Sequence, residues 1–420
     1  RGVAMGGIDL MAGDAGLQRS AADKLRVSSF EDPDPERLPL IEKALAGQLH
    51  PSARQSLELA QAAVLLASDD EAQRLKAATK LGEARMPVVR PLLAQRLEQE
   101  SSDVVQTAIR QSLASIDRSL ALGQVLGQLF TGLSLGSILL LAALGLAITY
   151  GLMGVINMAH GELIMIGAYA TWLVQVFFRQ HLPGLFDWYL LAALPVAFTA
   201  SALVGAAMER SVIRYLYGRP LETLLATWGL SLVLMQSVRS LFGAQNVGVE
   251  NPVWMSGNLT LLGNLTLPWN RLIIIGFALA VLAGVALLIS RTRLGLFVRG
   301  VTQNRPIASC MGVNTARIDT YAFALGSGIA GLAGCALSQI GNVGPDLGQS
   351  YIVDSFMVVV LGGVGQLAGT VYAALGLGLF NKFLEGWAGA VLATIAVLVF
   401  IIVFIQKRPQ GIFAFKGREA

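Results

Sequence analysis

Long apolar runs recur through the second part of the chain and constrain its fold more than any other feature. From residue 120 onward they follow one another, each about 20 residues long, which is the length that crosses a bilayer as an α-helix. Only 14% of the chain is charged, whereas roughly a quarter of an average soluble domain is charged. We therefore predict an all-α fold, with a polytopic membrane helical bundle in residues 119–420. The runs indicate about nine membrane segments, some of them broken, at 124–148, 158–178, 188–209, 221–242, 271–290, 320–340, 353–368, 370–386 and 388–406.

The beginning of the chain has the composition of a soluble segment. Residues 1–119 contain 15 Lys and Arg against 17 Asp and Glu, whereas residues 120–420 contain 16 against 10. Both cysteines, Cys310 and Cys335, lie in the apolar part, which excludes a disulfide scaffold or a cysteine-based zinc site from the first part. We therefore place a domain boundary at residues 118 and 119.

Helical spacing dominates this first domain. Apolar residues recur at positions i, i+3, i+4 and i+7 from Arg37 onward, as in amphipathic helices. Segments 71–82 and 103–114 resemble each other at an offset of 32 residues. A repeating helix pair is typical of a HEAT-like solenoid, and a plain helical bundle is the alternative. We expect residues 1–35, which are rich in Gly, Asp and Ser, to be irregular.

Lys and Arg residues predict the orientation of the bundle, because loops on the cytoplasmic side of a membrane are enriched in them. Counting crossings between the basic regions places the C-terminus in the cytoplasm and residues 1–118 in the periplasm. A periplasmic domain implies a signal segment, and the first residues lack the layout of one. The basic regions are Arg210, Arg214 and Arg219, then Arg291, Arg293, Arg299, Arg305 and Arg317, then Lys407, Arg408, Lys416 and Arg418.

Polar side chains interrupt the apolar sequence between residues 149 and 169, which reads TYGLMGVINMAHGELIMIGAY. Asn157, His160 and Glu162 are costly inside a bilayer, where such groups usually face a pathway or another helix. Helix-to-helix hydrogen bonding is the alternative role. We interpret the stretch as a broken helix that lines a substrate route, with His160 as a possible partner of Glu162. A metal site is not expected, because one His and one Glu two residues apart on a helix do not converge.

Two further groups extend this candidate site. Thr227 and Ser231 are four residues apart, so they share one face of a helix and are candidate pathway residues. The alternative is that they bond only to their own helix. Gly151 and Gly154 allow the backbone to bend where protein or water covers it. They are candidate hinge or packing residues.

A basic loop, residues 291–319, separates two of the runs and contains a short amphipathic piece closed by a glycine. Such a loop could contact anionic lipid. We favour docking into a cleft of a cytoplasmic partner, since a short helix between membrane spans suits that role. The candidate coupling residues are Gln303, Asn304, Arg305, Pro306, Met311 and Gly312.

The glycine-rich stretch GGVGQLAGT begins at Gly362 and includes Gly363 and Gly365. It lacks the lysine of a nucleotide-binding loop, and no strand precedes it, so tight packing or a hairpin turn is its expected role. The chain contains no nucleotide-binding, metalloprotease or nucleophile-elbow motif, so we expect no enzyme active site and no cofactor. The basic surplus is explained by membrane loops and does not indicate nucleic acid.

Three stretches carry a resemblance to a known family: VINMAHGELIMIGAY, the loop end MGVNTARID, and VVVLGGVGQLAGT. Here the chain resembles the permease subunits of branched-chain amino acid ABC importers, the LivH type. Within that family it is most similar to urea permeases, the UrtB type. This finer likeness is carried by the N-terminal helical extension, by QIGNVGPDLGQSYIVDSFMVVVLGG and by the tail NKFLEGW…FIQKRPQGIFAFKGR.

The resemblance implies an inner-membrane subunit that pairs with a second related permease. Two cytoplasmic ATPase subunits would drive it, and a periplasmic binding protein would deliver the solute. Urea or a short amide is the expected substrate, because the membrane part offers no evident cation deep in a span to receive a carboxylate. Branched-chain amino acids are the alternative. The sequence is also compatible with a passive channel or secondary transporter, and with a structural or sensing role centred on the first domain.

Overall fold

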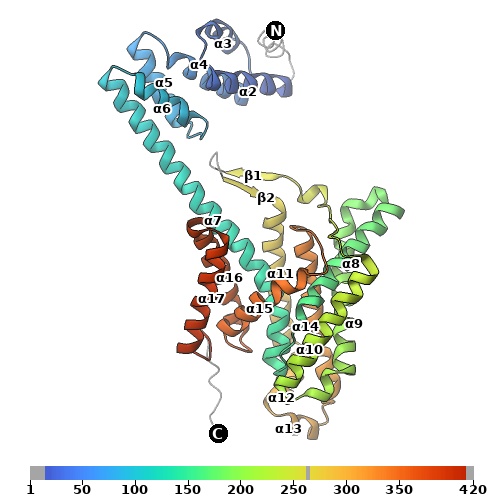
Figure 1. Cartoon of the computed structure of the whole chain (residues 1–420). Coiled ribbons are helices and arrows are strands. Elements are labelled where there is room, and N and C mark those ends of the chain that lie inside the picture. Colours follow the sequence, from blue (N-terminus) through green and yellow to red (C-terminus); the bar gives the residue numbers. More distant parts are fainter. Residues whose placement is uncertain (1–14, 262–264, 413–420) are drawn as a thin grey trace. The chain divides into compact units, whose positions relative to one another are not determined.

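The computed structural model describes residues 15–261 and 265–412, and these divide into two compact units. The first unit comprises residues 1–127 with 260–266, and the second comprises residues 128–259 with 267–420. Helix α7, Asp103–Met153, is continuous through the division at residue 127 (Figure 1). The segments expected in residues 1–14 and in the tail after residue 412 lie outside the described residues.

The first unit is built of short helices. Helix α2 spans Ala15–Glu31, a segment that we expected to be irregular, and this prediction is wrong. Ala21, Ala22 and Leu25 of α2 pack against apolar side chains of the following helices, and this tertiary burial outweighs a composition that reads locally as loop. The remaining helices of the unit are α3 (Leu38–Leu45), α4 (Pro51–Leu65), α5 (Glu71–Glu83), α6 (Val89–Gln99) and the start of α7.

The two similar segments of the sequence both form helices, α5 and the beginning of α7, and they pack closely. The Ser112 hydroxyl donates to the Ala78 carbonyl at 2.9 Å, and a Cβ on Gly82 would come within 2.3 Å of the Ser112 oxygen. Helix α5 begins at an Asp70 cap, whose side chain accepts from the Ala72 amide. The HEAT-like architecture remains a prediction.

A buried ion pair also holds the first unit together. Arg74 Nε and Nη2 donate to the two carboxylate oxygens of Glu100 at 2.9 and 3.0 Å. Burial by itself raises the pKa of Glu100. The Arg74 hydrogen bonds, the Ser102 amide and the charges of Arg74 and Arg96 outweigh burial, and together they lower that pKa below its usual value.

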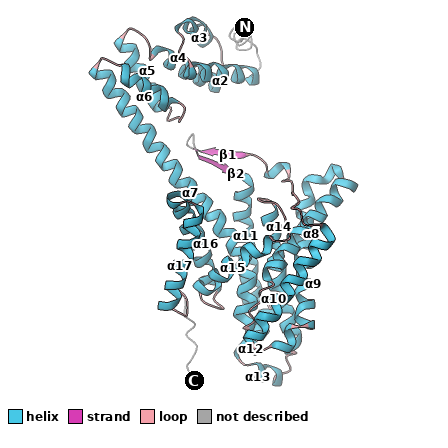
Figure 2. Cartoon of the chain, in the orientation of Figure 1, coloured by secondary structure: helices cyan, strands magenta, loops and turns pink. Residues whose placement is uncertain are grey.

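The second unit is a bundle of helices, as Figure 2 shows by the predominance of cyan ribbon. A pair of strands, β1 (Asn258–Leu261) and β2 (Leu265–Pro268), is an exception to the predicted all-α class, and the division assigns part of each strand to the first unit. The helices after α7 are α8 (His160–His181), α9 (Tyr189–Ser211), α10 (Pro220–Phe242), α11 (Trp269–Arg291), α12 (Arg293–Gln303), α13 (Arg305–Cys310), α14 (Thr315–Ser338), α15 (Leu347–Gly362), α16 (Leu367–Ala388) and α17 (Ala390–Lys407).

Among the described residues, eight helices are long and apolar enough to cross a membrane. The ninth predicted segment, 353–368, is not a span of that kind. The structure instead has the 16-residue α15, which begins at Leu347 and ends where Gly363 takes a φ of +98°. A left-handed glycine readily ends a helix, and residues 363–366 then form the turn into α16.

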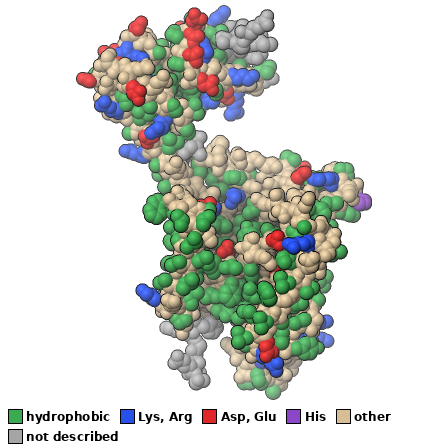
Figure 3. Space-filling model, in the orientation of Figure 1, with side chains coloured by type: hydrophobic (Ala, Val, Ile, Leu, Met, Phe, Trp, Pro, Cys, Tyr) green, Lys and Arg blue, Asp and Glu red, His purple; other side chains and the backbone are tan. Residues whose placement is uncertain are grey.

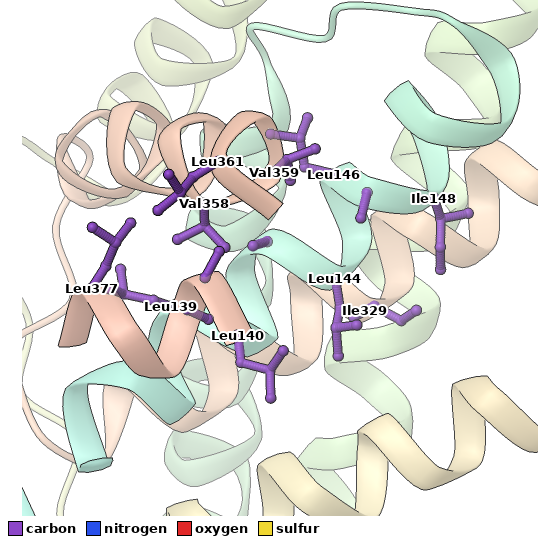
Figure 4. Packing of buried hydrophobic residues seen from close by; sticks show 14 of the residues in the cluster. Leu139, Leu140, Leu144, Leu146, Ile148, Ile329, Val358, Val359, Leu361 and Leu377 are labelled. Carbon is purple, nitrogen blue, oxygen red and sulfur yellow. The ribbon is translucent and has the colours of Figure 1, made fainter. Parts of the chain in front are cut away.

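Burial separates the central helices from the peripheral ones. In the most apolar 18-residue stretch of α14, 78% of the residues are buried, whereas 17% are buried in the corresponding stretches of α11 and α17. Much of the visible face of the second unit is therefore hydrophobic in Figure 3. A large apolar cluster joins α7, α14, α15 and α16 through residues such as Leu144, Ile329 and Val358 (Figure 4).

Glycines let α14 approach its neighbours at backbone distance. A Cβ on Gly331 would lie 2.4 Å from the Ala197 carbonyl oxygen of α9, and one on Gly334 would lie 1.9 Å from the Ile164 carbonyl oxygen of α8. Close approach of this kind is the usual function of small residues between membrane helices. Helix α14 is thus the central helix against which α8 and α9 pack.

Candidate functional site

The helix break predicted within residues 149–169 is present. Helix α7 ends at Met153, Gly154 has a φ of +66°, and α8 begins at His160. Residues 154–157 between the helices have no regular structure. A left-handed conformation favours glycine, because a side chain would be strained there.

Two side chains accept hydrogen bonds from backbone amides that the helix break leaves without a helical partner. Asn157 Oδ1 accepts from the Ala159 amide at 3.0 Å, and Thr227 Oγ1 on α10 accepts from the Met158 amide at 3.1 Å. The Thr227 hydroxyl in turn donates to the Thr223 carbonyl at 2.8 Å. Thr227 therefore bonds both to its own helix and across to the broken helix, which combines the two roles considered from the sequence.

Three polar atoms of the broken helix are buried without a hydrogen-bond partner among the described residues: Asn157 Nδ2, His160 Nδ1 and Glu162 Oε2. These side chains belong to residues that are 1%, 0% and 2% exposed. Groups of this kind are costly unless something satisfies them. We call these three residues the candidate pathway group. It offers one amide donor and two potential acceptors within six positions of the chain.

The predicted pairing of His160 with Glu162 is wrong. His160 Nε2 lies 2.8 Å from the Ala142 carbonyl oxygen of α7, so it is the protonated nitrogen of a neutral ring. Glu162 is approached instead by the Ser231 hydroxyl of α10. Ser231 and Thr227, which share one face of α10, therefore both contact the segment that contains the helix break. Their role in a pathway stays a prediction.

The start of α15 meets the start of α8 at two glycines. A Cβ on Gly161 would lie 2.4 Å from the Gly348 carbonyl oxygen, and one on Gly348 would lie 2.2 Å from the Gly161 carbonyl oxygen. This contact places the first turn of α15 beside Glu162, an arrangement that the sequence did not predict.

Sequence reasoning missed two ionisable residues of the second unit. Arg271, at the start of α11, donates to the buried Ser134 hydroxyl of α7 at 3.3 Å, and no ion pair to a described residue accompanies this bond. Asp354 of α15 is half-buried and has no hydrogen bond or ion pair within the described chain. Both lie within electrostatic reach of Tyr351. Asp354 is the single charge in an apolar run, a signal that could have identified it.

Several predicted packing and coupling residues line one cavity. Gly151, Gly365 and Gln303, together with Arg299 and Thr302, surround a space of about 460 Å³ with an otherwise apolar wall. Gly365 has a φ of +83°, and a Cβ on Gly151 would lie 2.5 Å from its Cα. Gly362 is equally close to the backbone of Gly369 at the turn between α15 and α16.

The basic loop forms helix α12 and then the short helix α13, and docking of α13 on a partner stays a prediction. Asn304 caps it by accepting from the Ile307 amide at 3.1 Å, Pro306 occupies its first turn, and Gly312 ends it with a φ of +86°. Ile307 and Met311 are 60% and 79% exposed and project from this end of the second unit. Arg305, in contrast, turns toward the bundle.

Comparison with known proteins identifies a family of permeases that the chain resembles in sequence. A family model described as "Branched-chain amino acid transport system / permease component" matches residues 128–406. The high-affinity branched-chain amino acid permease protein BraD of Pseudomonas aeruginosa is 28% identical over 293 residues, which cover 68% of this chain and 95% of that protein. The corresponding LivH protein of Escherichia coli K12 is 28% identical over 296 residues, with 68% and 94% covered.

A fructose import permease protein, FrcC of Rhizobium meliloti, is 30% identical over a shorter stretch of 152 residues, which covers 34% of this chain. No solved structure matches the chain. The family match includes the broken helix, the basic loop and the glycine turn, so the chain belongs to the branched-chain amino acid transport system permease family.

Proposed function

We propose that this chain is the membrane-spanning permease subunit of an ATP-driven importer for a small nitrogen-containing solute, located in a bacterial inner membrane. The observation that carries the proposal is the broken α7–α8 junction, where unpartnered polar atoms of Asn157, His160 and Glu162 are buried within six positions of one another in the chain. Polar groups at such a position are by default a pathway.

Energy for transport has to come from partner subunits, because the sequence has no nucleotide-binding motif. The exposed apolar side chains of Ile307 and Met311 on α13 suit insertion into a cleft of an ATPase subunit. We expect two such subunits, a second related permease and a periplasmic binding protein. Alternating access would follow from rocking of the permeases, with the backbone breaks absorbing the change.

Two substrate classes remain candidates, and different observations favour each. The names of BraD and LivH favour a branched-chain amino acid, and in this respect the comparisons support the substrate that we placed second from the sequence. Arg271 and Asp354 add a cation and an anion that could receive the carboxylate and the ammonium of an amino acid.

Urea or a short amide is favoured by the chemistry of the broken helix. A neutral amide carries N–H donors and one carbonyl acceptor. The unpartnered Asn157 amide nitrogen supplies a donor, and His160 Nδ1 and Glu162 Oε2 supply acceptors. No cation lies among these three residues, which suits an uncharged solute.

Uptake of labelled leucine and labelled urea by cells that express the chain with its transport partners tests the function and separates the substrates. We expect ATP-dependent uptake of one solute, reduced by Glu162→Gln. If the solute is an amino acid, Arg271→Gln raises the KM, whereas Asn157→Leu has the larger effect on urea. Uptake that persists without the ATPase subunits would instead support a passive channel.

The orientation needs its own test, because we propose a periplasmic first unit. Ser56, a natural choice for a cysteine label, is 9% exposed and donates to Asp23, so a cysteine there would react poorly. Gln55 is exposed, and the exposed Cys310 can be replaced by Ser to remove background. Gln55→Cys should react with membrane-impermeant reagents in intact spheroplasts. Labelling only after permeabilisation would place this unit in the cytoplasm.

A further inference from the structure

A buried charged cluster lies directly behind α13. Asp319, on the first turns of α14, is 4% exposed and forms an ion pair with Arg305 at the first residue of α13. The Arg305 guanidinium also lies over the Tyr217 ring, 5.0 Å from its centroid. Arg305 therefore holds α13 against the bundle and does not point outward with Ile307 and Met311.

The cluster continues to the end of α9. Glu209 is fully buried, and its carboxylate accepts from the Thr320 hydroxyl at 2.6 Å and from the Tyr217 hydroxyl at 3.1 Å. Burial, followed by the charges of Asp319 and Glu209, raises the pKa of Tyr217 far above its usual range, so its hydroxyl remains a donor. Arg214 Nη2 lies 3.4 Å from the same carboxylate and balances its charge.

These contacts make one connected path from α13 to the centre of the bundle. Asp319 and Thr320 are adjacent on α14, so Arg305 and Glu209 attach to the same turn of that helix. Gly334, which packs on the α8 backbone, lies 15 residues further along, or about 22 Å at the rise of an α-helix. A displacement of α13 is therefore passed to the helix against which α8 and α9 pack.

We propose that Arg305, Asp319, Tyr217, Glu209 and Thr320 form a charged latch that couples movement of α13 to α14, and that Arg305 and Asp319 are positioning residues of the transport cycle. This inference rests on the proposed function and deepens it. It assigns two roles within one loop. Ile307 and Met311 bind the ATPase, whereas Arg305 transmits the resulting movement of α13 to α14. The sequence had assigned Arg305 and Met311 the same role.

Separating Arg305 from Asp319 is costly, and this cost makes the latch resist movement of α13 relative to α14. A charge pair with one member almost fully buried loses much of its stabilisation when either partner is displaced, because an uncompensated charge would remain inside. Its attraction is also less screened by salt than that of an exposed pair. α13 therefore cannot move independently of α14 at low cost.

The test uses the full importer, purified with its ATPase subunits and reconstituted into vesicles with binding protein and solute. We compare Arg305→Gln, Asp319→Asn and the double variant, and measure the solute transported per ATP hydrolysed. Each single variant should lower this ratio roughly fivefold or more, the lower end of typical coupling between two sites. The double variant should be no worse than the worse single variant, since both remove the same contact.

Arg317→Gln is the matched control, because this arginine is exposed, lies in the same segment and has no ion pair within the described chain. It should leave the ratio unchanged. Ile307→Ser with Met311→Ser should reduce co-purification of the ATPase, whereas the latch variants should retain it. If Arg305→Gln does not fold, Asp319→Asn still decides, because Arg305 is half-exposed and tolerates loss of its partner.

The outcomes separate failure of the inference from failure of the proposed function. If the unmodified chain does not associate with an ATPase, the proposed function is wrong. If it associates and couples normally, but Asp319→Asn and the double variant keep the full ratio of solute to ATP, the latch is wrong.

Discussion

The close approach of α14 to α8 predicts that one added methyl group at Gly334 destabilises the second unit. In Gly334→Ala, the new Cβ would lie 1.9 Å from the Ile164 carbonyl oxygen and 2.7 Å from the Ala168 amide nitrogen. Both atoms belong to the backbone, so no side-chain rotation relieves the clash. Overpacking of this severity costs about 3 kcal/mol, and the better helix propensity of alanine returns about 1 kcal/mol. We expect a net loss of about 2 kcal/mol in the free energy of unfolding.

Denaturant unfolding of the purified chain in detergent micelles measures this loss. Gly284→Ala on α11 is the control, because nothing lies within 4 Å of a Cβ at that position. The control should be as stable as the unmodified chain or up to about 1 kcal/mol more stable. A Gly334→Ala chain that unfolds at the same denaturant concentration as the control would refute the backbone-to-backbone packing of α14.

Three other substitutions test the broken helix and the first unit. Glu162→Gln should reduce uptake without loss of assembly, and a normal transport rate with normal co-purification would remove this carboxyl group from the pathway. Thr227→Val keeps the shape of the side chain but leaves the Met158 amide without its acceptor, which should cost about 1–3 kcal/mol in unfolding measurements; Thr227→Ser should restore most of the loss. Glu100→Gln should remove an acid-dependent part of the stability of the first unit. Because Arg74 lowers the folded pKa of Glu100, this stabilisation is fully present above the ordinary glutamate pKa of about 4.3 and is lost as the pH falls through the lower folded value. The free energy of unfolding, measured by circular dichroism between pH 6 and pH 3, should therefore depend less steeply on pH in the variant.

The sequence was sufficient for features that depend on local pattern. Apolar runs located eight spans, and the polar and glycine-rich stretch 149–169 indicated a break between two of them, because length, hydropathy and glycine content are each encoded within a short segment. Amphipathic spacing likewise identified the helices of the first unit after residue 37.

Features that depend on tertiary contact could not be obtained in this way. Helix α2 forms in a segment with loop-like composition because Ala22 and Leu25 are buried by other helices. His160 bonds to the Ala142 carbonyl of α7, 18 residues away, and not to its neighbour Glu162. Periodicity places side chains on a face but does not say which neighbouring helix that face meets.

The latch shows the same limit. Arg305 and Met311 lie in one basic loop, and the sequence assigned both to ATPase coupling. In the structure, Arg305 turns inward to Asp319, whereas Met311 projects outward. The direction of each side chain is decided by how α13 packs on α14 and by Tyr217, which comes from a distant part of the chain.

Dependence on ATP tests the central claim most directly. The chain should be reconstituted into liposomes alone, and separately with its permease partner, ATPase subunits and binding protein, and solute entry should be followed with and without ATP. The account predicts entry only in the complete assembly with ATP, and none through the chain alone. Solute entry through the chain by itself, at a rate that ATP does not change, would contradict it.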